Sequence, residues 1–423
     1  MLGLAKEVKP FLKAKPKVKH PRADNVVFGL HYKVTFSILL IFSALVSSYN
    51  YFDSSGSAIQ CYFDKNVQVP GVVINRYCWM MSTFTLPKYF EGERGEDFVH
   101  PGVGFHTEED EKVYHAYYQW VPLFLSFQAI FFYAPHWIWK QMEGGRFQNL
   151  VCSILNEQEE VVKYLVKRLR KLKPKSFVSK SHQEHRSWAL KFAFCECLNL
   201  ANVIFQMVLT NKFLGGEFWH YGIEVWTFLS MEPEQRVDPM SRIFPRMTKC
   251  IFHKYGGSGT IQRFDALCVL GMNIINEKIF IFLWYWYMVL LVVTAVALLV
   301  RFCQFCYPDS RERVFNLYLT FGLSKEEAAT FGHQVKVITM KLDYSDWLIL
   351  YYLSQAMTRD NFLVFLSRLA KETEDSSVIS EKPEPHPTVE ENAEQNENKD
   401  GTLPANYSLM EQKDEKSVQE TKL

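Results

Sequence analysis

The chain has 423 residues, a formal net charge of +1, and 15% aromatic residues, including 34 Phe. Its mean hydropathy of −0.11 excludes a protein embedded in the membrane from end to end, so apolar blocks must alternate with polar ones. The balanced charge gives no support for a nucleic-acid partner, and nine scattered cysteines do not form a small disulfide scaffold.

Residues 1–33 form a basic N-terminal segment, followed by the first apolar block. Residues 1–22 hold seven Lys or Arg and one acid, without the apolar region of a cleaved signal peptide. Residues 34–52 are all uncharged, between Lys33 and Asp53, and they are long enough to span a bilayer. Ser43, Ser47 and Asn50 share one face of this helix. That polar stripe either bonds to a neighbouring helix or faces water, which makes it a candidate pore face.

Residues 53–112 form a long, net negative loop that contains Cys61 and Cys78. Residues 113–139 then give an uncharged run that is about 40 Å long as a helix, enough for a second span. Pro122 lies inside this run and predicts a kink, which transmembrane helices tolerate better than soluble ones.

Residues 140–191 are strongly basic and precede the third apolar block at 192–211, which only Glu196 interrupts. An acid in a span is tolerable when it faces the helix bundle or reaches the interface. A second long loop, 212–278, contains Cys250 and Cys268. Residues 279–300 are uncharged and rich in Leu, Val and aromatic residues, and they predict the fourth and strongest span.

The C-terminal part is polar again. Residues 301–370 mix apolar and charged residues at helical spacing, and the uncharged stretch Trp347 to Thr358 is too short to span, so it predicts a core helix of a helical cytoplasmic domain. The acidic tail 371–423 has too few large apolar residues to order itself. Its ending, Thr421-Lys422-Leu423, has the form of a ligand for PDZ domains, although such endings are common by chance.

The positive-inside rule gives the orientation. Lys and Arg concentrate in 1–22 and 140–191, so these segments and both termini are expected in the cytoplasm. The two cysteine-containing loops are then extracellular, where Cys61, Cys78, Cys250 and Cys268 favour disulfides. The sequence allows three pairings of these four cysteines.

Signals for other chemistry are weak, and we expect no enzyme activity, cofactor or metal site. His182 and His185 lack a third ligand at a persuasive spacing, and Cys303 and Cys306 lack a second pair. The basic runs lie beside spans, where the anionic inner leaflet explains them better than nucleic acid does.

Several motifs together are more specific than the topology. The run Tyr117, Tyr118, Gln119, Trp120, Val121 and Pro122 resembles the signature of the innexin family at the start of its second span. Residues 194–203, 213–219, 244–250 and 276–280 also resemble innexin segments. The resemblance covers roughly residues 22–370.

The resemblance implies an all-α membrane protein, a four-transmembrane-helix subunit of a large-pore channel with disulfide-braced extracellular loops. It also implies that eight subunits form a ring, made of this chain alone or mixed with other innexins. Such a ring docks onto a ring of the neighbouring cell. By similarity, Cys61 pairs with Cys268 and Cys78 with Cys250. The implied function is a subunit of gap-junction channels, in the plasma membrane at cell–cell junctions, that pass ions and small solutes.

Two alternatives are an unpaired channel that releases small metabolites and a tetraspan adhesion or scaffold protein without a pore. Glycans on the outer loops would obstruct docking, and neither loop contains an Asn-x-Ser/Thr sequon. The single sequon, at Asn406, is in the tail. This favours the cell–cell channel.

Overall fold

The structure, a computed structural model, describes residues 24–52, 58–63, 69–90, 92, 95–156, 180–231, 239–320, 332, 335–336, 338–339 and 342–380. The chain divides into two compact units, Met1–Ser376 and Ser377–Leu423. The contacts discussed below lie in the first unit. The predictions for residues 1–22, for most of the acidic tail and for the PDZ ligand at Thr421 and Leu423 lie outside the described residues.

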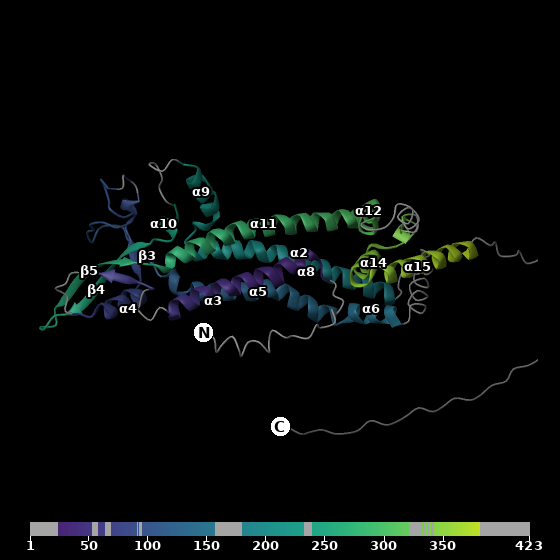
Figure 1. Ribbon diagram of the computed structural model, residues 1–423, viewed down its shortest axis with the longest axis horizontal. Helices are drawn as coiled ribbons and strands as arrows, with labels where there is room; N and C mark the ends of the chain where they lie inside the picture. The colour runs from purple at the N-terminus through teal and green to yellow at the C-terminus, as the bar shows by residue number, and fades with distance from the viewer. Residues whose placement is uncertain are drawn as a thin grey trace, which may run out of the picture. The chain divides into compact units, whose positions relative to one another are not determined.

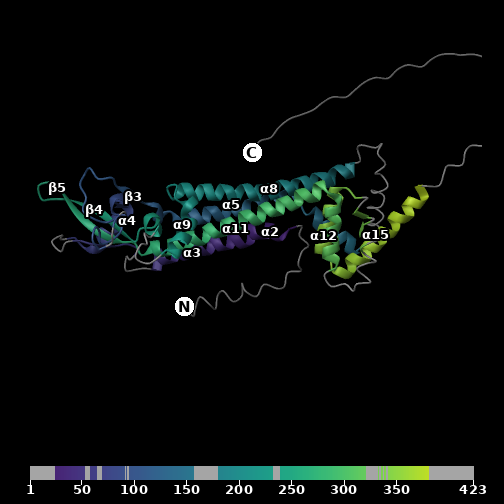
Figure 2. The ribbon, with the colours of Figure 1, turned by 90° about the horizontal axis from the view of Figure 1, so that it is seen from above.

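Four helices in the described chain are long and apolar enough to cross a membrane: Val26–Tyr49, Val121–Glu143, His185–Phe213 and Met272–Cys306. They belong to the continuous run α2 (Val26–Gly29), η1 (Leu30–Thr35) and α3 (Phe36–Phe52), and to α5 (Val121–Glu143), α8 (Lys180–Phe213) and α11 (Met272–Cys306). Helix α3 packs against α5 and α11, and α8 packs against the same two helices (Figures 1 and 2). Their shared core is apolar and includes Leu39, Leu125, Phe132, Val203 and Phe280.

The helices begin and end at different residues from the uncharged runs. The first begins at Val26, before the predicted 34, and carries Lys33 as an exposed side chain. The fourth begins at Met272, before the predicted 279, and includes Glu277. That acid is fully buried and pairs with Arg246 at 2.8 Å and Lys278 at 2.6 Å. A buried charge is tolerable when it is paired in this way, so a charge does not mark the end of a span here.

The predicted kink at Pro122 is wrong. Residues 113–120 precede the second helix, and Val113–His115 forms strand β3. Pro122 therefore lies in the first turn of α5, where the missing backbone N–H has no partner to lose. The proline inside this helix is Pro135, which is buried.

The prediction of an all-α chain is wrong for the long loops, which together build an antiparallel sheet. Its strands are β1 (Gln60–Tyr62), β2 (Thr83–Thr85), β3 (Val113–His115), β4 (Met247–Tyr255) and β5 (Ile261–Val269), in the order β1-β5-β4-β2-β3. Helix α4 (Gly71–Met81) and the short helix η2 (Pro87–Tyr89) belong to the first loop. We call these elements, with residues 95–116, the sheet module. Three of its strands have only three residues, too few to give a recognisable alternation in sequence.

Two helices connect the bundle to β4: α9 (Phe218–Ser230) and α10 (Pro239–Ile243). Helix α9 lies against α11, and two aromatic side chains of α11, Trp284 and Tyr285, meet α9 at Gly222. The hydroxyl of Tyr285 donates to the carbonyl oxygen of Gly222 at 3.0 Å. A Cβ atom at Gly222 would overlap the ring of Trp284, so this contact requires glycine.

Replacing Gly222 with Ala is expected to destabilise the chain by about 1–3 kcal/mol, because overpacking forces the buried Trp284 ring out of place. Thermal melting of the purified chain would measure the loss. Gly257→Ala is the matched control, since a Cβ there meets nothing within 4 Å. Equal melting temperatures for the two variants would contradict the expected overlap.

At the end of the bundle opposite the sheet module, α6 (Arg146–Asn156), α12 (Pro308–Thr320), α14 (Tyr344–Ala356) and α15 (Arg359–Ser380) surround a second apolar core. We call these four helices the end domain. Its largest fully buried side chain is Trp347, which contacts Phe315 edge to face. Helix α14 is the buried core helix that the uncharged stretch at Trp347 to Thr358 predicts.

Candidate functional site

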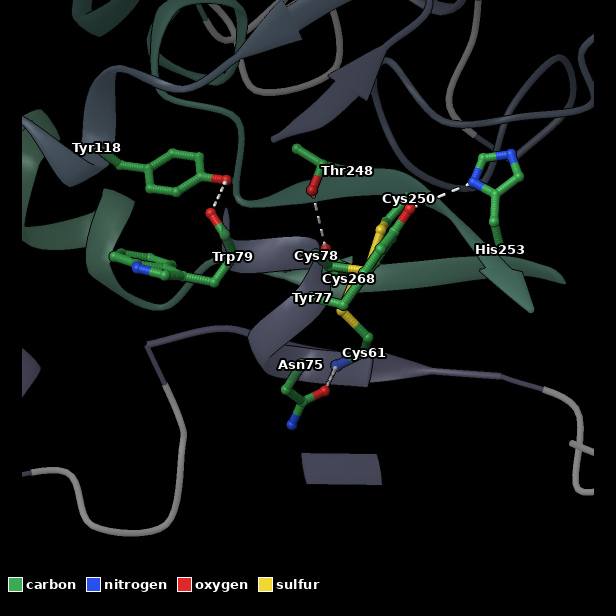
Figure 3. The surroundings of a disulfide bond; sticks show 10 residues. All are labelled: Cys61, Asn75, Tyr77, Cys78, Trp79, Tyr118, Thr248, Cys250, His253 and Cys268. Atoms are coloured by element: carbon green, nitrogen blue, oxygen red, sulfur yellow. Dashed lines mark hydrogen bonds between the residues drawn. A yellow bond between two sulfur atoms is a disulfide. The ribbon is translucent and has the colours of Figure 1, made fainter. Parts of the chain in front are cut away.

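Two disulfides hold the sheet module together. They join Cys61 to Cys268 and Cys78 to Cys250, across sequence separations of 207 and 172 residues. Each bond links the first long loop to the second, and this is the pairing that the innexin resemblance implies. Figure 3 shows both bonds beside helix α4 and strands β4 and β5.

The local structure positions each cysteine. Cys61 and Cys268 are directly opposite each other on β1 and β5, and the backbone N–H of Cys61 donates to Asn75 Oδ1 at 2.9 Å. Cys78 is on the face of α4 that packs against β4, where Cys250 lies. The sulfur atoms of Cys61, Cys78 and Cys268 lie within 4.8 Å of one another. The two disulfides are therefore neighbours, and these sulfurs are in covalent bonds instead of holding a metal.

The segment Tyr117–Gln119 connects this module to the bundle as the short helix η3. The Tyr118 ring lies 4.6 Å from that of Trp79, and its hydroxyl donates to the Trp79 carbonyl oxygen at 3.5 Å (Figure 3). The Gln119 side-chain amide donates to the same oxygen. Trp79 is adjacent to Cys78 in α4, so the signature residues fix the start of α5 against the disulfide-bonded helix.

The other side of η3 faces the membrane helices. Tyr117 is edge-on to Phe244, with ring centroids 5.6 Å apart, and to Phe213 at the end of α8. Burial raises the pKa of Tyr118 to about 12, so its hydroxyl stays protonated and available as a donor. The signature thus forms the joint between the sheet module and the bundle.

A buried lysine holds the chain between β2 and β3 against the sheet. Lys249 on β4 donates to the Gly104 carbonyl oxygen and to His106 Nδ1, both at 2.9 Å, and pairs with Asp265 at 2.8 Å. Burial lowers the pKa of His106, and the positive charge of Lys249 lowers it further. His106 is therefore a neutral acceptor in this contact at pH 7.

A second buried histidine makes the module sensitive to pH. His115 on β3 shares a hydrogen bond of 2.8 Å with Thr85 Oγ1, and burial lowers its pKa to about 4. The unfolded chain binds this proton first as the pH falls, because an unperturbed histidine has a pKa of about 6.5. Its contribution to stability is therefore complete above about pH 6.5 and decreases as the pH falls towards 4.

Lowering the pH from 7.5 to 5 is expected to reduce the free energy of unfolding by about 2 kcal/mol through His115 alone. Melting of the purified chain at both pH values, with His115→Gln for comparison, measures this contribution. The glutamine variant cannot take up the proton. The decrease in its free energy of unfolding between pH 7.5 and pH 5 should therefore be smaller by about 2 kcal/mol. Identical pH dependence in the two proteins would contradict the assignment.

The predicted pore face is wrong for Ser43. Its side chain is buried, and its hydroxyl donates to the Pro122 carbonyl oxygen and shares a hydrogen bond with Ser126, each at 2.8 Å. This is the helix-to-helix bonding that the same stripe also allowed. Ser47 is exposed in the single chain. The Asn50 backbone is part of α3, and its side chain lies outside the described residues.

A cluster of four polar residues joins distant parts of the chain where α8 and α11 meet the end domain. The Glu196 carboxylate accepts from Asn25 Nδ2 at 2.6 Å and from Arg301 Nε at 3.4 Å. Arg301 also donates to the Tyr352 hydroxyl at 2.5 Å. We call Asn25, Glu196, Arg301 and Tyr352 the polar node.

The polar node links α2, α8, α11 and α14. Asn25 also accepts from the backbone N–H of Phe28 at 2.5 Å, so it caps the first helix as well. The guanidinium of Arg301 lies over the rings of Phe192, Tyr351 and Tyr352, at 5.5–5.9 Å from their centroids. The sequence allowed Glu196 either to face the bundle or to reach the membrane interface. It gave no sign of these partners, of which Arg301 is 105 residues away.

The weak candidates for metal ligands, Cys303, Cys306 and His185, do not come together in one site. Cys303 and Cys306 are both exposed on α11, and His185 shares a hydrogen bond of 2.7 Å with Asp346. Within the described ranges, the three disulfide sulfurs named above are the one group of side chains close enough to hold a metal ion.

Comparison with known proteins finds innexins, and the matches cover most of the chain. The family model described as Innexin matches residues 24–373. Innexin inx2 of Schistocerca americana is 41% identical over 84% of this chain and 95% of its own length. Innexin inx2 of Drosophila melanogaster is 40% identical, over 84% and 93%, and Innexin shaking-B of the same species is 38% identical, over 81% and 88%. The chain therefore belongs to the innexin family, as the signature at Tyr117 to Pro122 indicated.

Proposed function

We propose that the sheet module is the surface through which this protein docks onto an identical module of the neighbouring cell. Innexins are gap-junction channel subunits, and this chain is therefore a structural subunit of channels that pass ions and small solutes between cells. It is a channel protein of the plasma membrane rather than an enzyme. The proposal concerns which part of the chain makes the contact between cells.

The rigidity of the module supports this assignment. Its two long loops are joined to each other by both disulfides, and Lys249 fixes the chain between β2 and β3 to the same sheet. A surface that is already ordered loses little conformational entropy when it binds a partner. Exposed apolar side chains on this module include Val99, Phe105 and Tyr255. Such groups can be buried when two modules meet.

We further propose the finer points of assembly that the resemblance implies. The subunits form an octameric ring, alone or mixed with other innexins, with both termini in the cytoplasm. The end domain then lies on the cytoplasmic side, and the basic composition of residues 140–191 suits contact with anionic lipid there. Thr421 and Leu423 would be available there to a PDZ protein.

Dual voltage clamp of two adjacent cells, both expressing this chain, tests the docked channel. Junctional current is expected, together with its loss when the second cell lacks the chain. A single-cell recording separates the alternatives. Current across one membrane without coupling would favour an unpaired channel. Absence of both currents, with protein at the surface, would point first to a required partner subunit and then to a scaffold.

A further inference from the structure

A large cavity lies beside the polar node, between α8 and α11, and the start of α14 closes one end of it. Its volume is about 910 Å³. That is near the upper limit of pockets that bury most of a small ligand. No residue of the sheet module lines it.

The lining changes from polar to apolar along the helices. Arg186 and Tyr344 line the end next to α14, whereas Leu200 and Ala295 line the end towards the middle of the bundle. Arg186 and Leu200 are 14 residues apart on α8, about 20 Å along its axis. The apolar end falls within the apolar blocks 192–211 and 279–300, at the depth of lipid chains. An occupant should therefore have a polar head and a long apolar chain.

One positive charge at the polar end has no ion pair with the residues that the structure describes. Glu196 and Arg301 neutralise each other within the node. Asp343 lies within electrostatic reach of Arg311. Arg186, by contrast, is exposed and forms no ion pair with any residue that the structure describes. Its guanidinium is suited to a phosphate group.

The side of the cavity is open to the surroundings of the bundle. Leu190, Leu299 and Phe302 line it and have exposed fractions of 63%, 63% and 66%. A lipid of the surrounding membrane could therefore enter sideways, without passing through water. These apolar side chains would be covered by the lipid chain once it is bound.

We propose that this cavity binds one anionic phospholipid, with its acyl chain between α8 and α11 and its phosphate group at Arg186. The lipid would connect the two spans to the start of α14, next to the contacts that hold α2. This inference requires only that α8 and α11 cross the membrane, so it stands or falls separately from docking between cells.

Cys197 provides a direct test, because it lines the cavity and its side chain is exposed. The full-length protein with Cys152, Cys195, Cys303 and Cys306 replaced by Ser keeps Cys197 as the reactive thiol. A matched protein keeps Cys152, which is exposed on α6 and does not line the cavity. Maleimide labelling of both is measured in detergent, with and without added phosphatidylserine.

Phosphatidylserine is expected to slow labelling of Cys197 about tenfold once nine-tenths of the sites are filled, and to leave Cys152 unchanged. Arg186→Gln should raise the lipid concentration needed for half protection about fivefold, the contribution of one basic residue near an anionic lipid. Ala193→Phe, which fills the lined space, should reduce the phospholipid that copurifies with the chain. Its melting temperature shows whether it still folds.

Two results would overturn the proposal. Protection of Cys197 without added lipid, lost when the assembly is dissociated to single chains, would mean that a neighbouring subunit covers the cavity. Equal protection by phosphatidylcholine, unchanged by Arg186→Gln, would mean that the anionic head group is not recognised.

Discussion

Replacing Cys61 and Cys268 together by Ser is expected to abolish junctional coupling and to lower the stability of the sheet module by about 2–5 kcal/mol. In the unfolded chain the intact bond between Cys78 and Cys250 lies inside this loop, so the bond between Cys61 and Cys268 closes a loop of about 35 residues, from Cys61 to Cys78 and from Cys250 to Cys268. Chain entropy places the loss of such a cross-link within this range. The three-residue strand β1 is held at the edge of the sheet by this bond and by its pairing with β5. Surface labelling and dual voltage clamp measure delivery and coupling separately.

The single variant Cys61→Ser is expected to lower the stability of the sheet module further than the double variant does, because it also endangers the second disulfide. It leaves the Cys268 thiol within 4.8 Å of Cys78 Sγ, close to the second disulfide. A thiolate at that position can attack the disulfide, form a bond between Cys268 and Cys78, and release the thiol of Cys250. The double variant has no such thiol. Peptide mapping without reduction would find the exchanged bond in the single variant and the native bond between Cys78 and Cys250 in the double one.

Normal coupling in the double variant would contradict a role for the disulfide in the docking surface. A matched control is Cys303→Ser with Cys306→Ser, which removes two exposed thiols from the opposite end of the bundle. That variant should reach the surface and couple cells like the unmodified protein. Loss of coupling in both would indicate a general effect of cysteine replacement.

The spans could be predicted from sequence because a bilayer requires long uncharged runs, and all four runs lie within helices of the structure or overlap them. The residues at which the spans begin and end could not be predicted in this way. Residues 113–120 are uncharged, yet they form β3 and η3, since hydropathy does not distinguish a membrane helix from an apolar joint. Glu277 is charged, yet it continues α11 because Arg246 and Lys278 pair with it.

The sheet module and the polar node depend on contacts between residues far apart in the chain. Strand β1 pairs with β5 some 200 residues later, and no local pattern in three residues predicts that partner. The stripe at Ser43 and Ser47 predicted a polar face, but periodicity alone does not say whether another helix or water meets it. In the structure Ser126 meets Ser43.

The second large effect is expected at Arg301. Arg301→Met should lower the free energy of unfolding by about 3–5 kcal/mol, because it leaves the Glu196 carboxylate buried with Asn25 as its remaining partner in the polar node. The variant also removes the donor to Tyr352 and the cation above three aromatic rings. Thermal melting gives the total loss, and hydrogen exchange gives its location. Faster exchange is expected at both α2 and α14.

A double-mutant cycle separates the ion pair from the packing. Glu196→Leu combined with Arg301→Met removes both charges and leaves apolar groups of similar size, so its cost should be much smaller than the sum of the single variants. Asn25→Ala should cost about 2–4 kcal/mol, about 1 for the helix cap and about 1.5–3 for the hydrogen bond to the Glu196 carboxylate, with faster exchange at α2 and not at α14. If Arg301→Met and Asn25→Ala changed the same amides by the same amount, Arg301 would be a local contact. If α14 responds to Arg301→Met alone, the arginine is what connects the end domain to the first membrane helix.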